Sequence, residues 1–87
     1  MKIKQGFVVR TVGGETVVVP VGAMSKTFNG MINLNETGAM LWKFFTEEHT
    51  VEEATALLQA EYQIDEATAK KDAQAFVDNL VKHGFAE

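Results

Sequence analysis

Two side-chain patterns follow one another along this chain, and their order constrains the fold most. Up to Leu34 the chain is rich in the β-branched and aromatic residues that suit strands. From Asn35 onward, apolar residues recur at the three- and four-residue intervals typical of helices. A run of strands followed by a run of helices predicts an α+β fold. Because the chain has 87 residues, we expect a single domain with one core over residues 1–87.

The first part of the chain predicts a β-hairpin. Residues 7–12 and 16–19 are mostly valine, threonine and phenylalanine, and they flank the pair Gly13-Gly14. Glycine accepts the positive φ that a tight hairpin turn requires, so the turn is expected at this pair. Pro20 fits the end of the second strand because it cannot donate a hydrogen bond to a neighbouring strand.

A third strand is expected after a loop. Residues 22–30 look like a loop, although Asn29-Gly30 is also a strong hairpin signal, so the turn type stays open. Residues 31–34 then predict a short strand at the edge of the sheet. The sheet is therefore expected to have three antiparallel strands.

Capping residues mark three helices in the rest of the chain. Asn35 can accept a hydrogen bond from the first free amides of one helix, and Asp65 can do so for another. Thr50 and Glu53 have the spacing of a capping box, which predicts the start of the middle helix. Gly84 predicts the end of the last helix. Because only a few residues join the last two helices, we expect them to pack closely as a helix-turn-helix.

Charge and cysteine content narrow the classes of function. The net charge is −4, whereas a protein that binds duplex DNA needs clustered lysine and arginine. The charge is uneven, since the part through Asn35 is near +3 and the remainder near −7. The absence of cysteine removes disulfides and thiolate metal sites, and no signal peptide or membrane helix is visible. A cytoplasmic protein is expected.

No catalytic, cofactor or metal site is predicted from the side chains. Ser25 has no nucleophile motif around it, and His49 and His83 are each expected near a helix end. Asp72 has no second acid or base placed beside it by a motif, so a structural role is favoured. Trp42 and Phe44-Phe45 are expected in the core, because a chain of this size needs its aromatic residues for stability.

Several motifs, in this order and spacing, resemble those of the PqqD-like family over nearly the whole chain. They are Val17-Val18-Val19-Pro20, the run from Ile32 to Ala39 (INLNETGA), Leu41-Trp42, Thr50 to Ala54 (TVEEA), Glu61-Tyr62, Asp72 to Phe76, Leu80 and Gly84. The resemblance implies a winged helix-turn-helix, with an N-terminal three-stranded antiparallel sheet followed by a three-helix bundle. Val19 to Gly22 depart from the pattern of the members in pyrroloquinoline quinone (PQQ) biosynthesis, so the pathway is left open.

The resemblance also implies a function without catalysis. Such domains are recognition elements that hold the leader of a ribosomally made precursor peptide and present it to a radical SAM or other modifying enzyme. The leader would add as a strand to the third strand, which requires a free strand edge. The expected peptide-binding residues lie on that strand and on one flank of the last helix: Gly30, Met31, Ile32, Asn33, Leu34, Lys70, Gln74, Val77 and Val81.

Two other functions remain as alternatives. A winged-helix DNA-binding or regulatory protein would use Lys70, Lys71 and Lys82 of the last helix, although three acidic residues on that helix would repel phosphate. A homodimer joined through the free strand edge would need no peptide at all.

Overall fold

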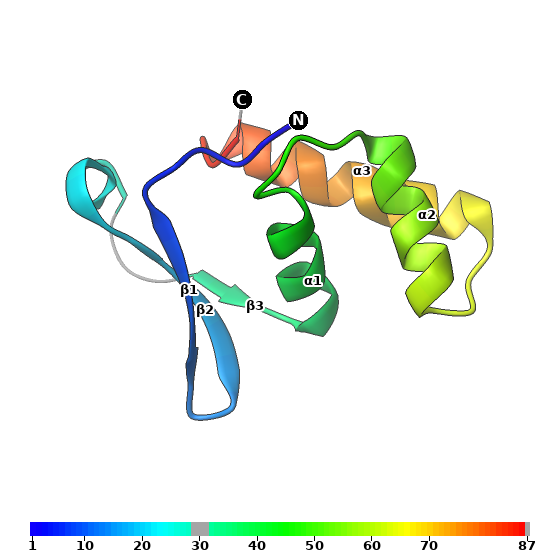
Figure 1. The fold of residues 1–87 in the computed structure, drawn as a ribbon, viewed down its shortest axis with the longest axis horizontal. Coiled ribbons are helices and arrows are strands. Elements are labelled where there is room, and N and C mark those ends of the chain that lie inside the picture. The colour runs from blue at the N-terminus through cyan, green and yellow to red at the C-terminus, as the bar shows by residue number, and fades with distance from the viewer. Residues whose placement is uncertain (29–31, 87) are drawn as a thin grey trace.

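The structure is a computed structural model that describes residues 1–28 and 32–86. It confirms the α+β class and the order of strands before helices (Figure 1). The question whether Asn29-Gly30 form a hairpin turn or part of a longer loop falls, with Met31, outside the described residues. The elements are β1 (Phe7–Val12), β2 (Glu15–Pro20), the short 3-10 helix η1 (Gly22–Lys26), β3 (Ile32–Leu34), α1 (Glu36–Phe44), α2 (Val51–Glu61) and α3 (Glu66–Lys82).

The sheet is antiparallel with the strand order β1-β2-β3. The hairpin turns at Gly13 and Gly14, whose φ angles of 57° and 82° are both positive, as a type I′ turn requires. Val12 pairs with Glu15 directly beside this turn. The tip of the hairpin projects away from the helices (Figure 1).

The segment after β2 differs in part from the expected loop, because Gly22–Lys26 form one stretch of 3-10 helix. Gly22 has a φ of 59°, and its carbonyl accepts a hydrogen bond of 2.7 Å from the Ser25 hydroxyl. A single short turn of this kind has no apolar periodicity, so pattern reading does not detect it.

The helix boundaries follow the expected caps. The Asn35 side chain accepts a hydrogen bond of 2.7 Å from the Gly38 amide. Thr50 and Glu53 form both bonds of the capping box, at 3.1 and 2.9 Å. Asp65 holds the N-cap position of α3, but its side chain makes no capping bond to the backbone.

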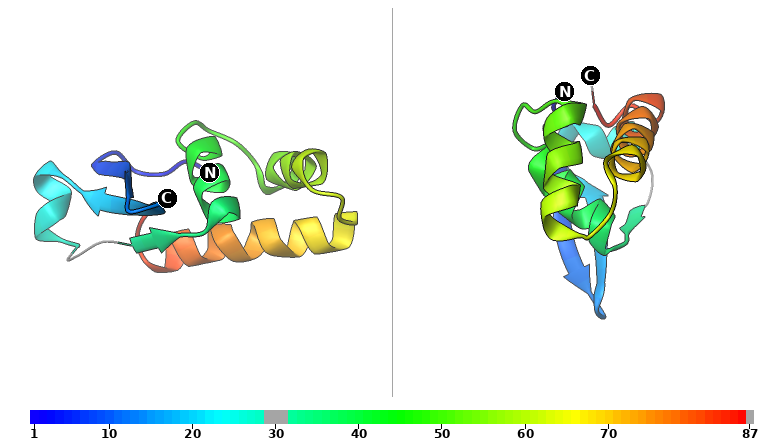
Figure 2. Two further views of the ribbon diagram at one scale, coloured as in Figure 1. Left: turned by 90° about the horizontal axis from the view of Figure 1, so that it is seen from below. Right: turned by 90° about the vertical axis from the view of Figure 1, so that its right-hand side faces the viewer.

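The core lies where α1 and the end of α3 meet the inner face of the sheet, and it continues between α3 and α2, which lies away from the sheet (Figure 2). Its most deeply buried large side chains are Val18, Leu41, Phe45 and Leu58. Trp42 is buried and Phe44 half-buried, so the aromatic residues of α1 serve the core as expected. The two ends of the chain meet in an antiparallel bridge between Ile3 and Ala86.

Candidate peptide-binding site

Strand β3 forms one edge of the sheet. Its residues Ile32, Asn33 and Leu34 pair with Val18, Val17 and Thr16 of β2, and β3 is the last strand in the order. Within residues 1–28 and 32–86, no strand of the chain pairs with its outer side. The backbone groups on that side are therefore available to an extended chain from another molecule.

The two faces of β3 differ. Leu34 packs against the core, and the alternation of side chains along a strand places Ile32 on the same face. Asn33 points to the opposite face and is exposed. A peptide paired with β3 would likewise send alternate side chains to the core side, next to Ile32 and Leu34.

An apolar pocket of about 320 Å³ lies at the start of β3. Ile32, which is 36% exposed, forms its β3 side. The other lining residues come from the inner face of the sheet, the segment before β3 and the end of the chain: Phe7, Val18, Pro20, Phe28, His83 and Phe85. The pocket could accept a bulky apolar side chain.

Aromatic packing fixes the shape of this pocket. The rings of Phe28 and Phe85 stack with their centroids 4.9 Å apart. Phe7 meets both rings edge-on, at 5.2 and 5.1 Å. The Trp42 ring contacts Phe85 edge-on from the core side, with the ring centroids 5.8 Å apart. These contacts preorganise the pocket, so little ordering free energy is needed when a ligand enters.

His83 supplies the polar group of the pocket lining. Its Nδ1 lies 2.9 Å from the Asn79 carbonyl oxygen, and a carbonyl can only accept, so Nδ1 carries the proton in this contact. The other ring nitrogen, Nε2, remains available as a hydrogen-bonding group. The same flank of α3 carries Asn79, Phe76 and Asp72, which precede His83 by four, seven and eleven residues.

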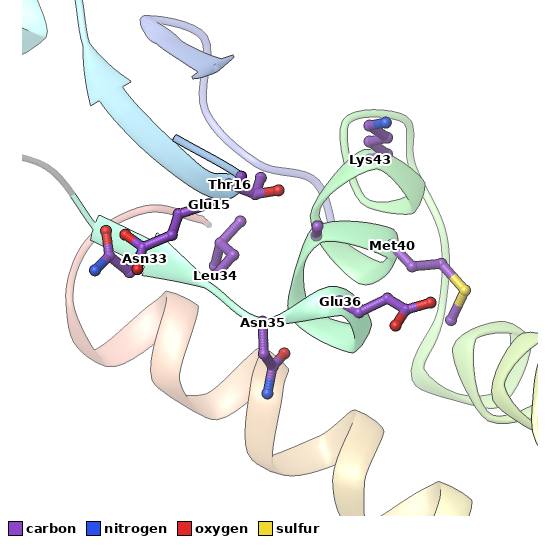
Figure 3. Close-up of a pocket in the computed structure, with 10 residues that line it drawn as sticks. Glu15, Thr16, Asn33, Leu34, Asn35, Glu36, Met40 and Lys43 are labelled. Atoms are coloured by element: carbon purple, nitrogen blue, oxygen red, sulfur yellow. The ribbon is translucent and has the colours of Figure 1, made fainter. Parts of the chain in front are cut away.

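A second, more polar hollow lies at the other end of β3 (Figure 3). One side of the hollow is formed by Asn33 and Leu34 of β3 and by Asn35, which follows the strand. Side chains of α1 form the other side. The α1 residues are Glu36, Ala39, Met40 and Lys43, while Gly14, Glu15 and Thr16 complete the lining. A peptide along β3 would therefore pass from an apolar pocket to a polar hollow.

The structure separates the expected site residues into two groups. Ile32, Asn33 and Leu34 lie together on the free edge, whereas Gly30 and Met31 lie outside the described residues. The α3 residues are not brought to β3 as a set. Lys70 lines a small hollow beside Glu52, Thr55, Ala56 and Gln59 of α2.

The remaining α3 residues also lie elsewhere. Gln74 is exposed, and its amide donates to Asp78 of the same helix at 2.8 Å. Val77 is buried in the core. Val81 is 49% exposed and lines a surface hollow with Lys4 and Met24. Helical spacing places Lys70, Gln74 and Val81 on one flank of α3, as expected. However, His83, from the opposite flank, is the residue that lines the pocket with Ile32.

Sequence reasoning did not identify Phe28 and Phe85 as site residues. Phe28 falls in a segment expected to be a loop, and Phe85 follows the glycine that ends α3. The position of Phe85 had a usable signal, because the residue after a C-terminal glycine often packs back onto the last turn of the helix. Nothing in the local pattern around Phe28 indicates its position.

Other classes of site receive no support from the described residues. Within the part of the chain that the structure describes, no group of three or more His, Asp or Glu side chains is placed to hold a metal ion. Among the helices of that part, none is long and apolar enough to cross a membrane.

The fold and its open edge define the class of the protein as a winged-helix-like α+β domain with a sheet edge that can accept a strand. The chain belongs to the family described as coenzyme PQQ synthesis protein D (PqqD), whose model matches residues 15–86. No curated protein matches its sequence.

Two solved structures share the fold. One is described as TbiB1 in complex with the TbiA(beta) leader peptide; it is 24% identical, the match covers 100% of this chain and 95% of that one, and the TM-score is 0.78. The other is lasso peptide synthetase B1 complexed with the leader peptide, with 21% identity, 99% and 95% coverage and a TM-score of 0.76. Both matches span nearly all of this chain, including the strands and the helices.

Proposed function

We propose that this chain is a non-catalytic module that binds the leader of a ribosomally made precursor peptide and presents it to a modifying enzyme. The observation that carries the proposal is the free edge of β3 directly beside the apolar pocket. Family membership supports it, as does the likeness to two structures described as leader-peptide complexes. A radical SAM enzyme or a similar maturase, in the cytoplasm, is the proposed partner.

Main-chain pairing with β3 supplies affinity that does not depend on the sequence of the peptide, and the pocket supplies selectivity for one of its side chains. Main-chain hydrogen bonds form along Ile32–Leu34 whatever the peptide side chains are. A bulky apolar residue of the leader would enter the pocket between Ile32 and Phe28. Both edge strands line this pocket, β1 through Phe7 and β3 through Ile32. Phe7 is packed against Phe28 and Phe85 whereas Ile32 is exposed, which favours the β3 edge.

The charge near the pocket favours acidic residues in the leader. Lys4 and Lys82 line the surface hollow that shares Phe28 and His83 with the apolar pocket. Positive charge there would attract carboxylates that flank the apolar anchor of the peptide. The attraction would mainly raise the association rate and would weaken with salt.

The proposal is tested with a synthetic peptide that carries one bulky apolar residue flanked by acidic residues, titrated into ¹⁵N-labelled protein. We expect the amide signals of Ile32, Asn33 and Leu34 to shift and their hydrogen exchange to slow. Ile32→Asn removes apolar contact from the pocket and should raise the dissociation constant at least about ten-fold. Val12→Asn is the matched control, because Val12 is more exposed and lies beside the hairpin turn, outside the pocket.

Either of two results would contradict the proposal. One is binding that perturbs the Lys70 to Gln74 surface of α3 and leaves β3 unchanged. The other is an equal loss of affinity in the Ile32 and Val12 variants, since a generic loss of stability would then explain both. Circular dichroism of each variant shows whether the fold is kept.

A further inference from the structure

Asn35 occupies the position where strand β3 ends and helix α1 begins. Its backbone is still extended, with a φ of −75° and a ψ of 178°. Its side chain caps α1 by accepting the bond of 2.7 Å from the Gly38 amide. Because a backbone amide can only donate, the atom that it meets must be the side-chain oxygen, Oδ1. The capping bond therefore leaves both N–H groups of the side-chain nitrogen, Nδ2, unused.

The Nδ2 group lies on the open side of β3. Strand β2 pairs with one side of β3, and the order β1-β2-β3 leaves the other side free. Figure 3 shows β2 on one side of β3 and α3 on the other, and the Asn35 side chain points to the α3 side with its nitrogen outermost. Asn35 is exposed, and among the described residues its nitrogen has no acceptor. Two donors thus face the side on which a paired peptide would run.

Main-chain pairing with β3 cannot extend beyond this point. From Glu36 onward the backbone is helical, and the Asn35 carbonyl already accepts from the Ala39 amide at 2.8 Å. Carbonyl groups inside a helix bond within the helix, so an added strand finds no further partners there. Because β3 itself has only three residues, it offers few main-chain bonds. An additional donor at its end would therefore make a substantial difference to the affinity for a peptide.

We propose that the Asn35 side-chain amide donates a hydrogen bond to a main-chain carbonyl of the leader peptide, where the peptide leaves β3. The inference rests on the proposed function, because it requires a peptide paired with this edge. Asn35 then has two roles, since its oxygen fixes the start of α1 and its nitrogen binds the ligand. The capping bond holds the amide in place before the peptide arrives, so little side-chain entropy is lost on binding.

This bond adds affinity without selecting a particular side chain. A main-chain carbonyl is present at every residue of a leader, and a neutral amide pairs with it without a charge to desolvate. Selectivity stays with the apolar pocket at the other end of β3.

Asn35→Ser separates the two roles, because serine caps a helix about as well as asparagine but has no amide group. The synthetic peptide with one bulky apolar residue flanked by acidic residues serves again as the probe. Loss of one hydrogen bond should raise its dissociation constant roughly three- to ten-fold. The midpoint of thermal unfolding should stay close to that of the wild type. Asn35→Asp also keeps the cap but turns a carboxylate oxygen toward the peptide carbonyl, so it should bind more weakly still.

Thr50→Ala is the matched control. It removes the cap of α2 and lowers the stability of the domain, but it leaves the Asn35 amide in place. The folded protein should therefore bind the peptide as the wild type does. In ¹⁵N-labelled wild type, the side-chain NH₂ signals of Asn35, identified by their loss in Asn35→Ser, should shift downfield on peptide addition because the group gains an acceptor.

The outcomes separate this inference from the proposed function. The inference alone is overturned if the peptide shifts the β3 amides of the wild type but binds Asn35→Ser equally well. Equal losses of affinity in Asn35→Ser and Thr50→Ala would overturn it too, because weaker capping would then explain both. A wild type whose β3 amides do not respond to the peptide overturns the proposed function, and this inference with it.

Discussion

Gly84 shows how one residue prepares the candidate site. Its φ of 81° lies in the left-handed region, which favours glycine. The Phe85 amide donates to the Leu80 carbonyl at 2.8 Å, and the Gly84 amide donates to Val81 at 3.1 Å. This pair of bonds is the Schellman motif, and it turns the chain back after α3. Phe85 thereby reaches Phe28 and completes the apolar pocket.

Gly84→Ala is expected to destabilise the protein by about 1–2 kcal/mol, because a Cβ disfavours the left-handed conformation. For a domain of this size each kcal/mol lowers the midpoint of thermal unfolding by roughly 4–8 °C. Gly84→Asn should lose less, since asparagine tolerates this conformation better. Thermal unfolding followed by circular dichroism measures both variants. Equal midpoints for the two would argue against a conformational cause.

At the scale of elements, the start of α2 makes a pH-dependent contribution to stability. The pKa of Glu53 is lowered from its ordinary value of 4.5, first by the Thr50 backbone amide that donates to it and then by His49. A carboxyl whose folded pKa is lowered adds stability above its unfolded pKa, and that stability is lost as the pH falls through the folded pKa. The contribution of Glu53 is therefore present at neutral pH and disappears below pH 4.5.

Glu53→Gln tests this dependence. The wild type should unfold at a higher temperature than the variant near neutral pH, and the difference should shrink as the pH falls to about 3. The comparison uses thermal midpoints measured at each pH. Glu52→Gln is the control, because Glu52 lies in the same helical turn without the capping bonds. A difference between wild type and Glu53→Gln that stays constant over this range would contradict the assignment.

The elements also differ in whether the sequence pattern could predict them. The hairpin, β3 and all three helices were predictable because turn glycines, caps and apolar spacing are local signals. The 3-10 helix at Gly22–Lys26 was not, because one short turn has no repeat. Helical spacing separated the two flanks of α3, but the sequence alone did not indicate which flank faces β3. His83 rather than Lys70 meets Ile32, because the packing of α2 along α3 fixes the rotation of that helix.

For the whole molecule, one central side chain carries much of the stability. Phe45 is fully buried and contacts Phe44 and Phe76, at centroid distances of 5.5 and 6.4 Å. The Ile3 amide also donates to the Phe45 carbonyl at 2.8 Å, so the start of the chain is held against α1. The start of the chain, α1 and α3 therefore meet at this position.

Phe45→Ala is expected to cost about 3–5 kcal/mol, a large share of the roughly 5–15 kcal/mol typical of a folded domain. Urea unfolding monitored by far-ultraviolet circular dichroism should show a much lower midpoint or no folded baseline. Phe44→Ala, which removes a half-buried ring from the same helix, should lose less. Similar losses for both variants would show that the core is not centred on Phe45.

The sequence by itself determined the elements, their order and the family resemblance, because caps, turn glycines and apolar spacing act locally. Tertiary structure alone decided which side chains share the pocket. Phe7, Phe28, Ile32 and Phe85 are far apart in the chain and meet only when the sheet folds onto the end of α3.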